Sequence, residues 1–94
     1  MFDKMKELWE MKKKVEEIKA ELDSMMLESE DNLVKVSING SQEIKFISIK
    51  TDLSSIDKVK LESSLLETVN RAVRQSQKMA AERMSHLGID LPRA

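Results

Sequence analysis

The spacing of apolar residues changes twice along this chain, and that change constrains the fold more than any other feature. Over the first 25 residues the apolar side chains follow a heptad seam that only Lys4 interrupts, and the residues between them are good helix formers. The seam residues are Met1, Leu8, Val15 and Leu22 at one heptad position and Met11, Ile18 and Met25 at the other. We predict a helix over residues 1–23, and its regular part, Phe2–Asp23, would be about 33 Å long at 1.5 Å per residue.

The period then falls to two, which predicts a β-meander over residues 24–50. In Leu33–Ile38 the side chains of Val34, Val36 and Ile38 share one face, and Asn39-Gly40 follows, a strong hairpin signal because both residues tolerate positive φ. A second strand over Ile44–Ile49 completes the hairpin.

Two details of the meander are less regular. The alternation slips between Phe46 and Ile47, which predicts a β-bulge or a strong twist there. Upstream, Ser24–Glu30 fits a third strand, although Met25–Leu27 would suit the end of the first helix equally well.

A second long helix is predicted within residues 57–86, from about Lys58 to Ser85, after the capping residues of Leu53–Asp57. Its apolar spacing runs through Leu65, Leu66, Val69, Ala72, Val73, Ser76, Met79 or Ala80, and Arg83 or Met84. Gly88 would end it, leaving a loose tail over 88–94. The expected fold class is therefore α+β in a single domain over residues 1–94: a long N-terminal helix, a three-stranded antiparallel meander and a long C-terminal helix.

The small size of the chain predicts a homodimer. A folded protein of 94 residues and 10.8 kDa buries only about two-thirds of its unfolded surface, so a monomer would be marginally stable. The second helix can cover one face of the sheet but not both, and the seam of the first helix has no other long partner. The candidate interface residues are Leu8, Val15, Ile18, Leu22, Val34, Val36 and Ile38.

Composition limits the chemistry that the chain can perform. The sequence has no Cys, no Tyr and a single histidine, His86, which at a helix C-terminus would complement the helix dipole. It also lacks a glycine-rich phosphate loop. We therefore expect no enzyme, no cofactor, no metal and no small-molecule substrate. Without a long apolar stretch or a signal-peptide core, we expect a soluble cytoplasmic protein that does not enter membranes.

Two groups of basic residues stand out against a net charge of −1 and a pI near 5.9. One is Lys12, Lys13 and Lys14 on the first helix; the other is Arg71, Arg74, Lys78 and Arg83 on the second. Spacings of three and four residues place Arg71, Arg74 and Lys78 in one stripe. Each group could also be an ordinary solvated helix face.

Trp9 is the single tryptophan, and with Phe2 and Met5 it widens the apolar stripe of the first helix. Packing against a partner helix is the simpler interpretation. Binding at a membrane surface is the alternative, but the opposite face mixes Glu with Lys instead of being dominantly basic.

The segments Leu33–Gly40, Ile47–Asp52 and Asn70–Ala72 resemble the YbaB/EbfC family of bacterial nucleoid-associated proteins, and the likeness covers nearly the whole chain. The chain departs from the family's pattern at Asp52-Leu53, where Asp-Pro is frequent, and at Asn32-Leu33, where Gly is common. The resemblance implies a homodimeric, cytoplasmic, nucleoid-associated protein that binds DNA and has no enzymatic activity.

With a net charge near zero, DNA binding would depend on the two basic groups. We expect mainly phosphate contacts and weak sequence preference, with four to six phosphates per dimer and a log–log salt slope of about −4 to −5. The acidic residues Glu28, Glu30 and Asp31 would keep the sheet away from DNA. The alternative is a protein-binding adaptor or chaperone that uses the Met-rich helical seam, and its binding should barely respond to salt.

Overall fold

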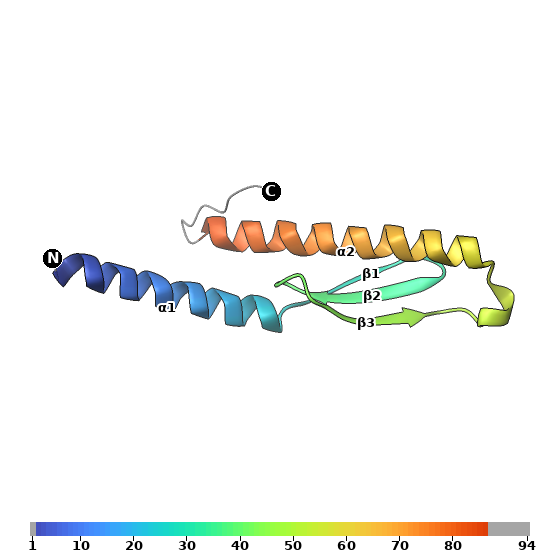
Figure 1. Ribbon diagram of the computed structural model, residues 1–94, viewed down its shortest axis with the longest axis horizontal. Coiled ribbons are helices and arrows are strands. Elements are labelled where there is room, and N and C mark those ends of the chain that lie inside the picture. The colour runs from blue at the N-terminus through green and yellow to red at the C-terminus, as the bar shows by residue number, and fades with distance from the viewer. Residues whose placement is uncertain (1, 87–94) are drawn as a thin grey trace.

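The computed structural model, described here for residues 2–86, has the predicted order of elements (Figure 1). The elements are α1 (Phe2–Ser24), β1 (Met26–Glu30), β2 (Val34–Asn39), β3 (Ile44–Ile49), a short 3-10 helix η1 (Leu53–Ser55) and α2 (Lys58–His86). The strands form one antiparallel sheet in the order β1-β2-β3, which confirms the α+β fold. Of the open Ser24–Glu30 segment, Ser24 belongs to α1 and β1 starts at Met26. The expected stop at Gly88 and the tail over 88–94 lie outside the described residues.

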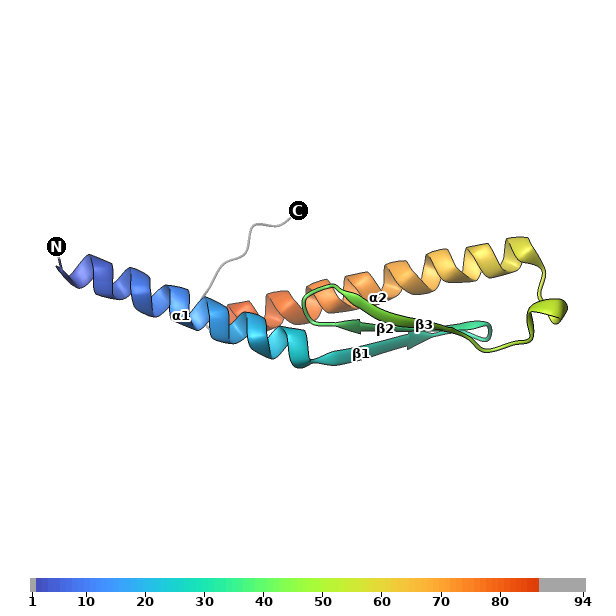
Figure 2. The same ribbon diagram turned by 60° about the horizontal axis from the view of Figure 1, so that its bottom comes forward.

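The molecule is long and narrow, with extents of 66 × 22 × 16 Å. Helix α2 runs along one face of the sheet, while α1 leaves the far end of the sheet and continues past the C-terminal end of α2 (Figures 1 and 2). The two helices meet where Ile18 and Leu22 of α1 pack against Ala80. Met11 and Leu8, about two and three turns nearer the N-terminus than Ile18, are exposed. Much of α1 therefore projects from the fold.

Small side chains hold α2 against the sheet. The buried residues of α2 recur every four positions and are Ser64, Thr68, Ala72, Ser76 and Ala80. None of them is large, so the helix backbone can lie close to the strands. The predicted apolar seam of this helix was therefore wrong in part: Ala72, Ser76 and Ala80 are buried, but Leu66 is 64% exposed and Val69 and Val73 only border the core.

The strand residues under α2 are fully buried. Val34, Val36 and Ile38 have no exposed surface, and the last two contact Ala72 of α2. In the sheet register they are opposite Ile49, Ile47 and Ile44 of β3. All six side chains therefore lie on the face of the sheet on which α2 packs.

The predicted bulge is present, one residue earlier than expected. Ser37 is paired with Phe46 and Ile38 with Ile44, which leaves Lys45 as an extra residue on β3. The extra residue restores Ile44 to the same face as Ile47 and explains the slipped alternation in the sequence.

The turn between β2 and β3 forms where Asn39-Gly40 predicted it, but through a different conformation. The Asn39 side-chain oxygen accepts hydrogen bonds from the backbone N–H groups of Ser41, at 3.0 Å, and Glu43, at 2.9 Å. The left-handed backbone falls on Gln42, with φ of 66°, and not on Asn39. Asn39 therefore serves as a side-chain cap of the turn.

Gly40 is needed for a close approach to α1. Its N–H donates to the Leu22 carbonyl oxygen at 2.8 Å, and a Cβ atom on Gly40 would lie 2.8 Å from that same oxygen. On the other side, the Ser76 hydroxyl donates to the Asn39 carbonyl at 2.7 Å and accepts the Gln42 N–H at 3.1 Å. The tip of the hairpin is thus bonded to both helices.

We predict that Gly40→Ala destabilises the protein by about 1–3 kcal/mol, because the added methyl group collides with backbone atoms of Leu22 that cannot move independently. The measurement is urea unfolding followed by circular dichroism. Gln42→Gly in the same turn is the matched control: it relieves a left-handed side chain and should be neutral or gain up to about 1 kcal/mol. Equal stability of Gly40→Ala and the wild type would show that the approach is not tight.

Candidate nucleic-acid interface

Arg71, Arg74 and Lys78 lie along one side of α2, as their spacing predicted, and we call them the α2 basic stripe. Arg74 is two residues from both Ala72 and Ser76, so at 100° per residue it points away from the sheet. Arg74 and Lys78 are exposed, and neither joins an ion pair within residues 2–86. Their charges are therefore available to a partner.

Arg71, the first residue of the stripe, already forms hydrogen bonds within the protein. It is half-buried, and its Nη1 donates to the Ser29 hydroxyl at 3.5 Å and to the Glu30 carbonyl at 3.4 Å. These bonds join α2 to the edge strand β1. Arg71 is therefore a contact between elements as well as a surface charge.

Arg83, the fourth predicted residue, does not belong to the stripe. It follows Lys78 by five residues, which turns it about 140° around the helix. Its guanidinium forms an ion pair with Glu21 of α1. Arg83 thus supports the contact between the two helices, and residue spacing did not indicate this partner 62 residues away.

Lys12, Lys13 and Lys14 are all exposed on the projecting part of α1. Because consecutive residues are 100° apart, the three ammonium groups surround the helix instead of forming a one-sided patch. Each ammonium group therefore faces a different direction around α1.

The acidic residues restrict the positive surface. Glu67 lies four residues before Arg71 and Glu82 four residues after Lys78, so a carboxylate stands at each end of the stripe. On the sheet, Glu28 pairs with Lys35 at 3.2 Å and Glu30 with Lys50 at 3.1 Å. The charges of these two acids are already partly neutralised, so their expected repulsion of DNA is weakened.

Asp31, the third acid expected to repel DNA, joins the β1–β2 turn to α2. One carboxylate oxygen accepts the backbone N–H groups of Leu33, at 2.8 Å, and Val34, at 2.9 Å, and the other accepts the hydroxyl of Ser64. The Ser64 hydrogen bond and then those of Val34 and Leu33 lower the pKa of Asp31 from 3.8 to about 2. The negative charge of Asp31 thus stabilises the fold through hydrogen bonds within the protein.

The structure divides the predicted dimer residues into three groups. Leu8 and Val15 are exposed on α1, whereas Ile18 and Leu22 are buried against α2. Val34, Val36 and Ile38 form the protomer core beneath α2, so a second chain could contact them only if α2 moved away. Ile44, Ile47 and Ile49 were not among the predicted interface residues; they lie on the same face and are 40%, 47% and 42% exposed.

Residues 2–86 contain no group of three or more His, Asp or Glu side chains placed to hold a metal ion. His86 is exposed at the end of α2. In the same part of the chain, neither helix is long and apolar enough to cross a membrane.

The comparison with known proteins agrees with a role for the exposed cations of α2 in binding nucleic acid. The model of the YbaB/EbfC DNA-binding family matches residues 1–91, and the chain belongs to this family, which is a family of DNA-binding proteins and not of enzymes. A nucleoid-associated protein of Legionella pneumophila (strain Corby) is 30% identical over 92 residues, covering 94% of this chain and 82% of the relative.

Two further relatives carry the same description. A nucleoid-associated protein of Prochlorococcus marinus subsp. pastoris is 32% identical over 88 residues, covering 92% of this chain and 73% of the relative. One from Desulforamulus reducens is 44% identical over 63 residues, covering 64% of this chain and 60% of the relative. The resemblance seen in the sequence is confirmed.

We predict that Asp31→Asn lowers the urea midpoint at pH 7, because the folded state favours the ionised carboxyl. Since the folded pKa is below the unfolded one, this stabilisation is complete above about pH 4 and is lost as the pH falls through about 2. The difference between variant and wild type should therefore narrow below pH 4.

The control is Asp52→Asn, at an exposed carboxylate whose side chain makes no capping hydrogen bond to η1. It should leave the midpoint unchanged at every pH. A pH-independent difference for Asp31→Asn would contradict a role for the charge.

Proposed function

We propose that this protein binds duplex DNA as a homodimer, mainly through phosphate contacts and with weak sequence preference, and that it acts in nucleoid organisation and gene expression. The observation that carries the proposal is the pair of exposed cations, Arg74 and Lys78, on the outward side of α2 in a member of a DNA-binding family; neither forms an ion pair within residues 2–86. The relatives' description as nucleoid-associated proteins supports a location in the nucleoid, within the cytoplasm.

Phosphate contacts follow from the groups available on α2. Arg74 and Lys78 are exposed charges without side-chain partners within residues 2–86, a suitable arrangement for phosphate oxygens. Gln77, a residue type that can recognise a base edge, donates its amide to Gln42 at 3.4 Å. The amide of Gln77 is therefore engaged within the protein, which supports weak base recognition by this side chain.

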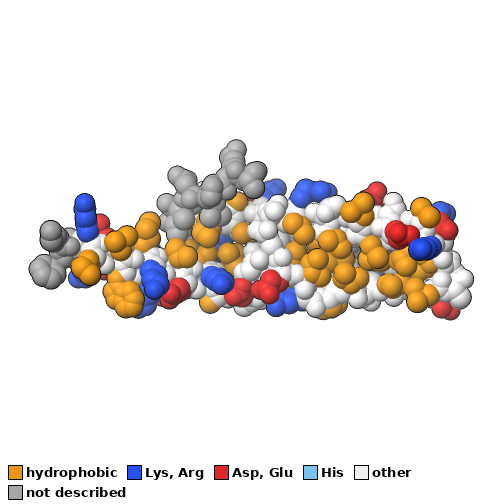
Figure 3. Space-filling view, in the orientation of Figure 1, with side chains coloured by type: hydrophobic (Ala, Val, Ile, Leu, Met, Phe, Trp, Pro, Cys, Tyr) orange, Lys and Arg blue, Asp and Glu red, His pale blue; other side chains and the backbone are white. Residues whose placement is uncertain are grey.

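The homodimer is supported by an incompletely covered apolar face. Arg71 contacts β1, and Val69, two residues away, is half a turn around α2 and so faces β3. Beside it, Ile44, Ile47 and Ile49 remain 40–47% exposed on the same side of the sheet. Figure 3 shows hydrophobic side chains gathered where α2 meets the sheet. A second copy placed on this face would cover the isoleucines and enlarge a small core.

A protein-binding adaptor is the second candidate, because the projecting part of α1 exposes its seam. Leu8, Met11 and Val15 are 67%, 55% and 40% exposed, which suits docking of a partner helix. Such docking would be nearly independent of salt, whereas DNA binding weakens steeply with it. A gel-shift titration on duplex DNA at two salt concentrations separates the two.

We predict that reversing Arg74 and Lys78 to Glu weakens duplex binding and makes the log–log salt slope shallower by about 3–4, since a dimer loses up to four phosphate contacts. Arg71 is left unchanged because its bonds to β1 support the fold. Fluorescence anisotropy of labelled duplex measures both quantities.

The matched control reverses Lys45 and Lys58, two exposed lysines outside the stripe, and makes the same change in net charge. It should lower affinity far less. Equal losses in the two variants would mean that DNA responds to overall charge and not to the α2 basic stripe.

For the dimer, we predict that Ile47→Asp yields a folded 10.8 kDa monomer in sedimentation equilibrium at micromolar concentration. Ile47 is half-exposed in the protomer, so the substitution should spare the protomer core, unlike a charge at the fully buried Val36. Phe46→Asp, its neighbour on the opposite face of β3, should remain dimeric. Dissociation by Phe46→Asp alone would place the interface on the other face.

A further inference from the structure

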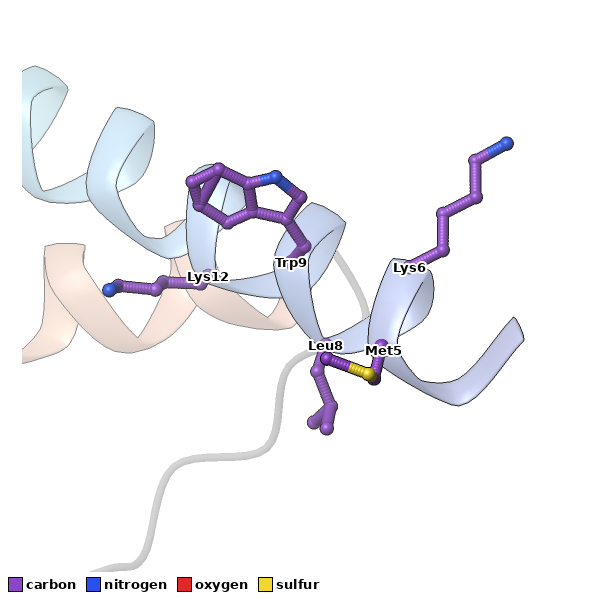
Figure 4. A pocket seen from close by; sticks show the side chains of 5 residues that line it. All are labelled: Met5, Lys6, Leu8, Trp9 and Lys12. Atoms are coloured by element: carbon purple, nitrogen blue, oxygen red, sulfur yellow. The ribbon is translucent and has the colours of Figure 1, made fainter. Parts of the chain in front are cut away.

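Trp9 does not lie where the apolar seam of α1 would require it. It precedes Ile18 by nine residues, which places it on the side of the helix opposite the contact with α2. Figure 4 shows its indole pointing to one side of α1, with Met5 and Leu8 pointing to the other. The side chain is 69% exposed. Extending the α1–α2 contact toward the N-terminus would therefore leave the indole uncovered.

The neighbours of Trp9 on the helix surface are mostly cationic. The four positions three or four residues away are Met5, Lys6, Lys12 and Lys13. Trp9 lines two open hollows that are formed by α1 residues alone. The first is lined by Met5, Lys6, Leu8, Trp9 and Lys12, and the second by Trp9, Glu10, Lys13 and Glu16. Side chains of one helix enclose no cavity, so this surface suits an extended ligand and not a small molecule.

We propose that Trp9 stacks on an unpaired base of single-stranded DNA while Lys6, Lys12 and Lys13 contact the adjacent phosphates. An exposed indole with Lys6, Lys12 and Lys13 within about one helical turn matches a ligand that alternates flat bases with anionic phosphates, although Glu10 and Glu16 also lie beside it. An intact duplex hides its base faces, and opening a step costs a few kcal/mol, so unpaired DNA is the favoured form. The choice of DNA as the ligand rests on the function proposed above.

The sequence provides its own probe for this site. Trp9 is the single tryptophan and the chain has no tyrosine, so the intrinsic fluorescence excited at long wavelength reports this indole. The full chain is titrated with an oligothymidine strand and, separately, with a duplex. The expected result is strong quenching by the single strand and much weaker quenching by the duplex.

Variants then assign the contact. Trp9→Ala should weaken single-strand binding about 5- to 150-fold, the range for loss of one stacked base, and leave duplex affinity within about twofold. Met11→Ala is the matched control and should change neither affinity, because Met11 is exposed but lies two residues, or about 200°, around α1 from Trp9. Replacing Lys6, Lys12 and Lys13 with Gln should make the single-strand salt slope shallower by about 2.

Several results would overturn the proposal. Absent quenching by the single strand, or unchanged affinity in Trp9→Ala, excludes stacking. If anionic lipid vesicles shift the Trp9 emission to the blue and DNA has no effect, Trp9 binds a membrane surface. If the emission shifts only with protein concentration, Trp9 packs against a second copy of the chain. By contrast, loss of duplex binding on reversal of Arg74 and Lys78, with quenching by the single strand retained, would support a separate site at Trp9 and would distinguish its test from the test of the proposed function.

Discussion

The hydrogen bond from the Gly40 N–H to the Leu22 carbonyl holds the rest of the molecule in place. It lies where the hairpin tip, the end of α1 and the middle of α2 converge, and Ser76 completes the junction by bonding to both Asn39 and Gln42. Because Gly40 lacks a side chain, the hairpin can satisfy a carbonyl at the end of α1 directly. This junction sets the direction in which α1 leaves the sheet, together with the packing of Ile18 and Leu22 on Ala80 and the Arg83–Glu21 ion pair.

The small residues of α2 have an equally wide effect. Ala72 and the other small buried residues of α2 let this helix lie close to β1 and β2. The isoleucines of β3 therefore remain partly exposed, and Val69 of α2 faces toward that strand. The same arrangement places Arg74 on the outward side of the helix. Apolar surface and cationic surface therefore occupy different sides of one element, so a second copy and a DNA duplex could be accommodated without competing for space.

The order of elements, the sheet and the bulge followed from periodicity, because alternation and helical spacing are local properties of the chain. The buried stripe of α2 followed only in its second half, through Ala72, Ser76 and Ala80; Ser64 and Thr68 were missed because they are polar and a search for apolar spacing passes over them. The partner of Arg83 is on another helix, and spacing along α2 carries no information about it. The direction of Trp9 was missed because proximity to Leu8 in the sequence suggested a shared face, whereas adjacent helical residues diverge by about 100°.

The elongated shape has a consequence for how densely DNA can be occupied. At 3.4 Å per base pair, the 66 Å length of a protomer corresponds to about 19 base pairs and its 22 Å width to about six. A copy aligned with the duplex axis would exclude neighbours from nearly two helical turns, while one lying across the axis would leave most of that length free. The number of copies bound at saturation on a duplex of known length thus reports the orientation of the long axis.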